Sequence, residues 1–404
     1  MMKDIYFCKT DEEWLKHSEE LEYPIHVTPC SIIIDYDDDN CIYRQLDNIP
    51  AVARLNHIKQ LGIANECRNL AGSGQTRYIH SLICATKIDY LAQMNNLNRE
   101  LAVTAAMMHD MATTPYSDSV SKKLKLGDEA NFESVLNSST GALAFLDKHN
   151  ISKKELCDLV TGKDKSVLGQ LVSSKGSIDV DRWSYTIYDA QRIGKLSSVL
   201  GNPYCPDPFK SMKIIDNTVV FEDVNEVRKF LETRVYMFES VYRNDELMAK
   251  EAFVGELAKE MWEKGIINKS NIFRLDDSQF ESLCHRYNEE LSARIFHVGY
   301  FDSYGKLPAG EEEVRQFMAG ITDRPFVVKK GFSMNPATDT PVLFKGKVKP
   351  YKEIDMPHSN SLQMRADSFK YTAVYGFEED SELAKAVRKA EAKFGRVNAP
   401  TETK

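Results

Sequence analysis

The chain has 404 residues, of which 42% are hydrophobic and 28% charged, and its formal net charge is −8. This composition suffices for one large domain or for a main domain with a smaller one attached, and no apolar run approaches the roughly 20 residues that a membrane-spanning helix needs. The acidic balance excludes a broad electrostatic grip on nucleic acid, which usually requires a basic face, but it permits a local pocket for a small anion.

The start of the chain and its cysteines predict a cytoplasmic protein. The first twenty residues, MMKDIYFCKTDEEWLKHSEE, lack the apolar stretch of a signal peptide. The eight cysteines are scattered without a C-x-x-C pair, in a chain far longer than the domains that disulfides staple. We therefore expect a soluble protein with free thiols and no membrane partner.

The predicted elements fall into three regions, and the predicted fold class is mainly α. In residues 1–50, an N-terminal segment, HVTPCSIIIDYDDDN combines a strand-like apolar burst with an acidic turn. Residues 51–320 have a mostly helical pattern, which begins with PAVARLNHIKQLG, a short helix with proline near its start and glycine at its end. Residues 321–404 change to β-branched runs broken by turn residues, which predict a smaller α+β appendage, a last helix over DSELAKAVRKAEAKFG and a polar tail.

The first histidine of interest lies in TRYIHSLICATKIDYLA, a segment with helical spacing. This helix would turn four apolar side chains toward the core: Ile79, Leu82, Ile83 and Leu91. His80 then lies beside a buried face, where a histidine is more often a satisfied core residue than a metal ligand. Taken alone, this residue leaves both interpretations open.

The adjacent His109 and Asp110 close the apolar run LAVTAAMM. An aspartate at the end of so apolar a run is costly to bury without a cation or hydrogen-bond partners. The pair therefore indicates a metal site, although the next ionisable side chain along the chain is only Asp118.

The segment VDRWSYTIYDAQR predicts a helix with two different faces. The packing face carries Val180, Trp183, Ile187 and Ala190, and the opposite face carries Asp181, Tyr185, Asp189 and Arg192. A solvated face would explain the charges, but it would not require a tyrosine between two aspartates.

Together, His80, His109, Asp110 and Asp181 form a mixed nitrogen and oxygen set of possible ligands. Such a set suits a divalent ion such as Mn²⁺, Fe²⁺, Mg²⁺ or Zn²⁺ with positions left for water and substrate. The predicted chemistry is metal-assisted hydrolysis.

The order His…His-Asp…Asp resembles that of the HD-domain phosphohydrolases, and among them the deoxynucleoside triphosphate triphosphohydrolases. The similarity covers residues 48–250 in five ordered blocks: IPAVARLNHIKQLG, TRYIHSL, MMHDMATTPYSD, IDVDRWSYTIYDAQRIG and ETRVYMFESVYRN. The resemblance implies an HD-domain helical fold over residues 51–320, a divalent metal, a nucleotide substrate that we expect to be a deoxynucleotide, and a homo-oligomer as one option for its assembly.

Carried over residue by residue, the resemblance makes His80, His109, Asp110 and Asp181 the metal ligands. It assigns the phosphates to Arg77, Arg182 and Arg234, the sugar 3′-hydroxyl to Gln60 and Asp189, and packing against the sugar to Tyr185 and Tyr242. Guanidinium groups suit phosphate oxygens and a carboxylate can accept from a hydroxyl. On the later helix, Arg234, Phe238 and Tyr242 are spaced to share one face that closes the pocket.

The departures from the family pattern are specific. Where relatives read H-D-x-x-H-x-P-x-S-H, this chain has Thr113 and Asp118 at the last two histidine positions. Ser121 stands where an aspartate is expected, and Phe132 where another histidine is expected. The resemblance implies that the residues expected at these positions form a relay that protonates the departing 5′-oxygen. The loss of this relay therefore concerns the triphosphohydrolase reaction itself.

We therefore expect a metal-dependent nucleotide phosphohydrolase without the usual histidine relay, with His109, Asp110 and Asp118 as its catalytic candidates. A nucleotide-binding sensor or partner subunit with weakened catalysis is an alternative, and so is an HD hydrolase for a different phosphate ester. A positioned acid typically contributes about 10²–10⁴-fold, and Thr113 cannot supply that proton. The sequence thus predicts weak or absent triphosphate release from deoxynucleotides.

A basic stretch near the C-terminus has two interpretations. It contains Lys329, Lys330, Lys345, Lys347, Lys349 and Lys352. These side chains could bind a regulatory nucleotide, as at subunit contacts in some relatives, but lysines on edge strands more often prevent aggregation.

Overall fold

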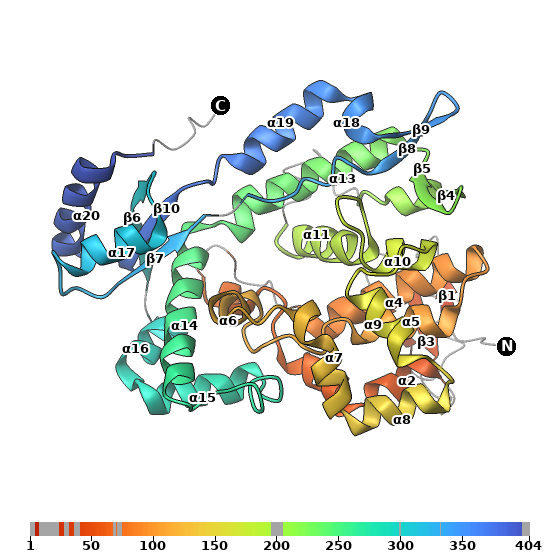
Figure 1. Ribbon diagram of the computed structural model, residues 1–404, viewed down its shortest axis with the longest axis horizontal. Coiled ribbons are helices and arrows are strands. Elements are labelled where there is room, and N and C mark those ends of the chain that lie inside the picture. Colours follow the sequence, from red (N-terminus) through yellow and green to blue (C-terminus); the bar gives the residue numbers. More distant parts are fainter. Residues whose placement is uncertain are drawn as a thin grey trace.

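A computed structural model describes the chain over residues 5–7, 24–27, 32–35, 41–67, 70, 75–194, 205–298, 300–331 and 333–397 (Figure 1). The fold is mainly α, as predicted, with small sheets at the edges of a helical body. Among the described residues, no helix combines the length and the apolar surface that crossing a membrane requires.

The helices of the first half surround the predicted metal ligands. In chain order they are α2 (Ile42–Asp47), α3 (Pro50–Ala53), η1 (Arg54–His57), η2 (Gly62–Glu66), α4 (Arg77–Met94), α5 (Arg99–Met108), α6 (Asp118–Leu124), α7 (Asp128–Ser138), α8 (Thr140–Lys148), α9 (Lys153–Val160), α10 (Val167–Val172) and α11 (Val180–Arg192). The predicted short helix after residue 50 is thus α3 followed by η1.

The helices of the second half cover the other side of the body. They are η3 (Pro208–Ser211), α13 (Val224–Met237), η4 (Phe238–Tyr242), α14 (Asp245–Glu263), α15 (Asp277–Tyr287), α16 (Glu289–Ala293), η5 (Arg294–Val298), α17 (Glu311–Ala319), α18 (Tyr351–Ile354), α19 (Met356–Asp367) and α20 (Ser381–Phe394). The last of these is the helix that the sequence predicts near the C-terminus.

The strands form three small sheets. They are β1 (Ile5–Phe7), β2 (Pro24–Val27), β3 (Ile32–Asp35), β4 (Met212–Ile215), β5 (Thr218–Phe221), β6 (Phe301–Leu307), β7 (Phe326–Lys330), β8 (Pro341–Phe344), β9 (Lys347–Pro350) and β10 (Thr372–Phe377). The strand orders are β1-β3-β2, β6-β10-β7 and β4-β5-β8-β9, and every pairing is antiparallel except that of β5 with β8. β2 and β3 bear out the apolar burst predicted in the N-terminal segment.

The residues beyond 320 contain strands and helices, as predicted, but their strands form no sheet of their own. β7 and β10 pair within a sheet that includes β6, and β8 continues the sheet of the β4–β5 hairpin. Figure 1 shows the C-terminal chain crossing from one of these sheets to the other, with α19 along α13. The predicted boundary at residue 320 therefore falls inside a sheet, and the tail after residue 397 lies outside the described residues.

Three helices position the candidate site, because α4 packs against both α5 and α11. Thr76 begins α4 by accepting a hydrogen bond from the backbone of Ile79, and Asp179 begins α11 in the same way. The predicted packing face of α11 is buried, with Trp183 at 1% exposure. The predicted core face of α4 is also buried, except that Ile79 is half-buried. Helical periodicity therefore fixed which faces of these helices remain for the site.

Two further sequence predictions can be compared with the structure. The described cysteines are all free thiols, and Cys8 and Cys30 lie outside the described residues. β9 is an edge strand on which Lys347 and Lys349 are exposed, a position that fits protection of the edge.

Candidate metal centre and its pocket

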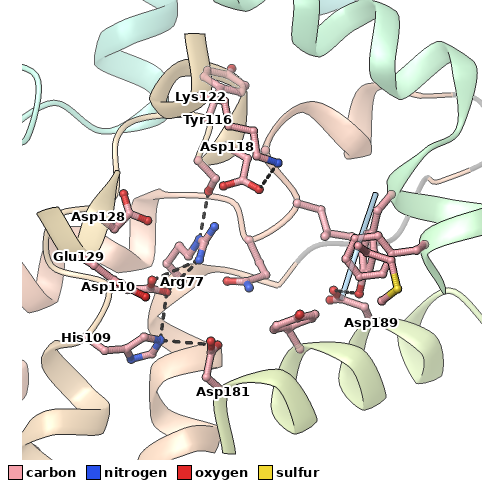
Figure 2. A pocket seen from close by; sticks show the side chains of 18 of the residues that line it. Arg77, His109, Asp110, Tyr116, Asp118, Lys122, Asp128, Glu129, Asp181 and Asp189 are labelled. Atoms are coloured by element: carbon pink, nitrogen blue, oxygen red, sulfur yellow. Dashed lines mark hydrogen bonds and ion pairs between the residues drawn. The ribbon is translucent and has the colours of Figure 1, made fainter. Parts of the chain in front are cut away.

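The four residues predicted as metal ligands lie close together where α4, α5 and α11 meet, and Figure 2 shows three of them, His109, Asp110 and Asp181. Nε2 of His80 lies 3.2 Å from Nε2 of His109 and 3.1 Å from Oδ1 of Asp181. Oδ2 of Asp110 lies 3.9 Å from Nε2 of His80 and 3.6 Å from Nε2 of His109. Side chains from distant parts of the sequence thus present nitrogen and oxygen atoms to one point.

Hydrogen bonds orient both imidazole rings toward this point. Nδ1 of His109 donates to the carbonyl oxygen of Ala106 at 2.7 Å, which leaves Nε2 as the free acceptor. Nδ1 of His80 lies 3.3 Å from Oγ of Ser184 on α11. Such partners on the far side of a ring fix its tautomer and its direction, as in known metal sites.

Arg77 holds Asp110 in place from the first turn of α4. Its Nη1 donates to both carboxylate oxygens, at 3.2 and 3.1 Å, and its Nε donates to Oγ of Ser117 at 3.1 Å. Burial alone would raise the pKa of Asp110, but Arg77 and His109 outweigh it and hold that pKa below its usual value. The carboxyl group of Asp110 is therefore ionised and able to bind a cation.

A cavity of about 500 Å³ opens from this cluster, a size within the range of small-molecule sites. All the residues predicted for the site line it except His80 and Arg182; they are Gln60, Arg77, His109, Asp110, Asp118, Asp181, Tyr185, Asp189, Arg234 and Tyr242. Figure 2 shows Asp181 and Asp189 projecting from one helix on one side of the cavity, with Asp118 and Lys122 on another.

Arg234 brings a buried positive charge to the cavity. The residue is 5% exposed, and its Nη1 donates to the hydroxyl of Tyr185. Its Nε is buried without a partner, and no carboxylate among the described residues pairs with it. The guanidinium lies 5.1 Å from the ring centre of Phe238, which excludes water from that side. Because a buried cation without an anion is costly, this position favours an anionic ligand.

The far end of the cavity is polar and aromatic. The Tyr242 hydroxyl donates to Oδ2 of Asp189 at 2.9 Å, and the rings of Tyr185 and Tyr242 meet edge to face at 6.2 Å. Burial raises the pKa of Asp189 to about 7. Gln60 is 7% exposed and its Oε1 has no partner within the described residues. These groups suit a ligand with an apolar ring and hydroxyl groups.

Two arginines of α11 do not line the cavity. Arg182 forms an ion pair with Asp179 and donates to the carbonyl oxygen of Ser177 at 3.3 Å. Arg192 is exposed and lies 5.9 Å from the ring centre of Tyr188. The structure therefore does not bring Arg182 to the phosphate position that the resemblance assigned, and it places Arg192 outside the site.

Thr113 and Asp128 supply an arrangement that the sequence analysis missed. Oγ1 of Thr113 lies 3.2 Å from Oδ1 of Asp110 and 3.2 Å from Oδ2 of Asp128. One hydroxyl hydrogen cannot serve two carboxylates, so one of the two must carry a proton for both contacts to be hydrogen bonds. Because Arg77 holds Asp110 ionised, that proton belongs on Asp128.

The electrostatics of Asp128 agree with this assignment. Burial raises the pKa of Asp128 to about 7, with a further rise from the negative charges of Asp110 and Asp118 and an opposing effect of Arg77. Asp128 also lines the cavity. The site thus contains a carboxyl group that is partly protonated near neutral pH.

Asp118, by contrast, is held ionised. Desolvation in the pocket would raise its pKa, but the side chain is still 53% exposed, and Lys122 and Arg77 lower that pKa. Nζ of Lys122 lies 2.7 Å from Oδ2 of Asp118, one helical turn away on α6. An ionised carboxylate has no proton to give, so Asp118 is poorly suited to the acid role.

Phe132, which stands where the family pattern has a histidine, does not line the cavity. Phe132 is fully buried in the core, whereas Asp128, one turn earlier at the start of α7, lines the cavity together with Glu129. Ser121 is also buried and does not contribute to the lining. Acidic residues at a helix start are common for reasons of helix stability, so the sequence offered no distinctive signal for Asp128.

Cys84 is another neighbour that the sequence analysis did not select. Its sulfur belongs to a group of four side chains, with His80, His109 and Asp181, whose ligand atoms lie within 4.8 Å of one another. The thiol contacts the carbonyl oxygen of Val180 at 3.9 Å, and burial raises its pKa well above the usual value. We interpret Cys84 as a protonated thiol that packs behind His80.

Residues 77–183 match the family model of the HD domain. The chain therefore contains an HD domain, and the matched residues include all four predicted metal ligands. The resemblance to the deoxynucleoside triphosphate triphosphohydrolases within this group is a finer expectation that the match does not address.

Comparisons over most of the chain give relatives in sequence and in structure. An uncharacterized protein of Mycoplasma genitalium is 25% identical over 267 residues, which cover 59% of this chain and 61% of that protein. A hypothetical protein from Aquifex aeolicus has a similar structure with a TM-score of 0.71 and 18% identity, over 91% of this chain and 99% of its own. A phosphohydrolase from Bacteroides thetaiotaomicron gives a TM-score of 0.67 and 18% identity, over 86% and 97%. The chain thus spans about three fifths of the length of this curated relative and nearly the full length of these two solved structures.

Proposed function

We propose that this protein is a metal-dependent phosphohydrolase that acts on a nucleotide, with a deoxynucleotide as the expected substrate. One observation carries the proposal: a single cavity joins a cluster of metal-ligand atoms to a buried arginine that has no carboxylate partner among the described residues. Metal and phosphate would meet in that cavity. The HD domain, and the fold shared with a protein described as a phosphohydrolase, support the same reaction class.

The donor set fits a divalent ion. Two imidazole nitrogens and two carboxylates suit Mn²⁺, Fe²⁺, Mg²⁺ or Zn²⁺. His80 and His109 outweigh the effect of burial and hold the pKa of Asp181 below its usual range, so its oxygen is free to bind a cation. When bound, such an ion supplies Lewis acidity for the hydrolysis of a phosphate ester.

In this proposal, arginines bind the phosphates. Arg234 offers Nε to an anion, and Arg77 approaches the same cavity while it orients Asp110. Fixed guanidinium groups stabilise charge that develops on phosphoryl oxygens without reorganisation. The sugar would pack against the contacting rings of Tyr185 and Tyr242, with hydroxyl contacts to Gln60 and Asp189.

Asp128 is our candidate for the proton donor to the leaving group. Thr113 connects it to Asp110, and it lines the cavity near Arg77 (Figure 2). A protonated carboxyl group in this position would do the work for which relatives use a histidine. The expectation of weak triphosphate release assumed that no donor is present, so Asp128 makes the choice of scissile bond an experimental question.

The test is metal analysis of the purified protein, followed by incubation with a panel of nucleotides and identification of products by chromatography. Deoxynucleoside plus inorganic triphosphate would show the triphosphohydrolase reaction. Tight nucleotide binding without turnover would favour the sensor or partner subunit, and turnover of other phosphate esters alone would favour a different HD hydrolase. Equal affinity for ATP and dATP in calorimetry would remove the role of Tyr185 in sugar selection.

A further inference from the structure

We propose that Glu281, His285 and His297 form a second metal site, suited to a borderline divalent ion such as Zn²⁺, at the surface formed by α15 and η5. The three side chains offer ligand atoms that all lie within 4.8 Å of one another. None of the three lines the cavity of the candidate active site. The inference is therefore independent of the proposed phosphohydrolase function.

The spacing of the ligand atoms is close to what a small ion requires. Oε1 of Glu281 lies 3.3 Å from Nε2 of His297 and 3.8 Å from Nε2 of His285. Zinc bonds of about 2.0–2.2 Å to nitrogen and oxygen place tetrahedral ligand atoms roughly 3.3–3.5 Å apart. Two imidazoles and one carboxylate are also a ligand set that zinc accepts with a water in the remaining position.

The local structure explains how these three residues meet. Glu281 and His285 are four residues apart on α15, so they share one face of the helix. His297 comes from η5, a π-helical turn that widens the backbone and brings its ring beside that of His285. Such turns occur frequently at functional sites. In Figure 1, α15 lies at the lower end of α14 and α16 lies to the left of α14, away from the centre of the fold.

A second hydrogen bond orients the carboxylate for this role. The hydroxyl of Tyr116 donates to Oε2 of Glu281 at 2.8 Å, which leaves Oε1 facing the two imidazoles. Carboxylates that bind metals are commonly held in this way by a partner behind them. Tyr116 is itself 1% exposed and packs against Phe296, so the support is rigid.

An ion pair without metal explains the cluster less well. No lysine or arginine among the described residues pairs with Glu281, so its carboxylate contacts only the two imidazoles and the hydroxyl of Tyr116. The rings of His285 and His297 are stacked 5.3 Å apart at 12°, an arrangement that two like charges would oppose. A bound cation would neutralise the carboxylate instead. The rings must turn for their nitrogens to converge on it, and the His297 side chain, 55% exposed, has room to do so.

A metal bound at the second site would stabilise the loop that contains Tyr116 beside the candidate active site. Tyr116 lines the cavity, and its backbone N–H donates to Oδ1 of Asp277 at the start of α15 at 2.7 Å. Tyr116 thus contacts α15 at two residues, Asp277 and Glu281. A metal bound at Glu281 would therefore strengthen the connection between α15 and this loop. Its expected role is structural, and its loss should loosen the loop before it affects the fold.

The experiment compares wild type with His297→Ala, His285→Ala and the control His57→Ala, which removes another exposed histidine. Each protein is stripped with a chelator, reloaded with ZnCl₂ alone, desalted and measured by mass spectrometry of metals. We expect wild type and His57→Ala to retain one Zn²⁺ per chain more than the other two variants. Circular dichroism checks folding, and because His297 is half exposed, His297→Ala decides the matter if His285→Ala fails to fold.

Equal zinc content in wild type, His57→Ala and His297→Ala would overturn the second site. An Asp181→Ala protein, measured in parallel, reports the cavity site alone and should keep the zinc held by Glu281. Failure of one site is therefore distinguishable from failure of the other.

Discussion

The two walls of the cavity, each taken together with one buried residue behind it (His80 and Thr113), differ in how they are built. The metal wall consists of His80, His109, Asp110 and Asp181, which lie on or directly after the regular helices α4, α5 and α11. The donor wall consists of Thr113, Asp118, Lys122 and Asp128, which follow turns in the chain from the end of α5 to the start of α7. Within the donor wall, Tyr116 and Ser117 have φ of 53° and 52°, a backbone conformation that is uncommon outside glycine.

The two walls have different roles in the proposed reaction. On the metal wall, rings and carboxylates are held by hydrogen bonds behind them, so the ligand atoms are arranged before any ion arrives. On the donor wall, a hydroxyl links two carboxyl groups in different protonation states. Metal binding and proton donation should therefore be separable by mutation.

The largest effect should come from Asp181→Ala. Loss of a carboxylate from the metal wall should remove the metal of the cavity, which lowers metal content by about one ion per chain, and activity should fall by roughly 10³-fold or more, because a catalytic metal contributes several kcal/mol. Metal analysis and turnover are measured on the same preparation. Arg192→Ala, an exposed change on the same helix, is the matched control and should keep both. Unchanged metal content in Asp181→Ala would remove this residue from the ligand set.

The second effect should come from Asp128→Asn, which keeps the size of the side chain but removes its titrating proton. We expect activity to fall by about 10²-fold, the lower range for a positioned acid, with metal content unchanged. In wild type, a donor with a pKa of about 7 is active when protonated, so the rate should decline as pH rises through 7. That decline should disappear in Asp128→Asn and persist in Glu129→Gln, which changes the adjacent residue.

The stability of Asp128→Asn at high pH provides a separate test, because the substitution should lower activity without lowering stability. The pKa of Asp128 is raised in the folded state from the usual 3.8 to about 7, so its contribution to stability is greatest in acid and is lost as pH rises between these values. Asp128→Asn should therefore be at least as stable as wild type at pH 8, measured by thermal unfolding. Lower stability at that pH would mean that lost activity reflects a damaged fold rather than a lost proton donor.

The sequence predicted the metal wall because helical periodicity and short motifs both act there. The apolar spacing of α4 and α11 fixed which face was buried, and the ordered motifs fixed His80, His109, Asp110 and Asp181 as one group. The mainly helical fold followed from the same spacing. These features depend on neighbours within one helix, which a sequence displays directly.

The donor wall could not be predicted in the same way. Asp128 reaches the cavity from the first residue of α7, which follows a turn where Lys125 ends α6 in a left-handed conformation, and the local sequence pattern does not display this approach. The pairing of β6 with β10 also depends on residues far apart, which is why the C-terminal region was expected as a separate appendage. The contact between His285 and His297 likewise depends on how two different elements, α15 and η5, pack together.

The third effect compares two arginines that the sequence analysis treated alike. Arg234→Lys should lower kcat/KM by about 10–100-fold, because a hydrogen bond between charged groups contributes about 1.5–3 kcal/mol and lysine cannot reproduce the planar fork. Arg182→Lys should change kcat/KM much less, since Arg182 pairs with Asp179 outside the cavity. Equal losses in both would show that Arg182 turns into the cavity when substrate binds.

The smallest effect should come from Thr113. It tests whether proton donation by Asp128 depends on the hydroxyl that connects this residue to Asp110. Thr113→Val keeps the shape of the side chain but removes the hydroxyl between Asp110 and Asp128. Loss of the neutral hydrogen bond from the protonated Asp128 should lower kcat by roughly 2–10-fold, because such a bond contributes about 0.5–1.5 kcal/mol. Thr113→Ser retains the hydroxyl and should stay near wild type. Thr113→His restores the residue type of the relatives, but its ring would compete with Asp128 for the space beside Asp110, so we expect no gain in triphosphate release. A rise in that product on Thr113→His, detected by chromatography, would show that the histidine relay can be rebuilt here and that Asp128 does not replace it.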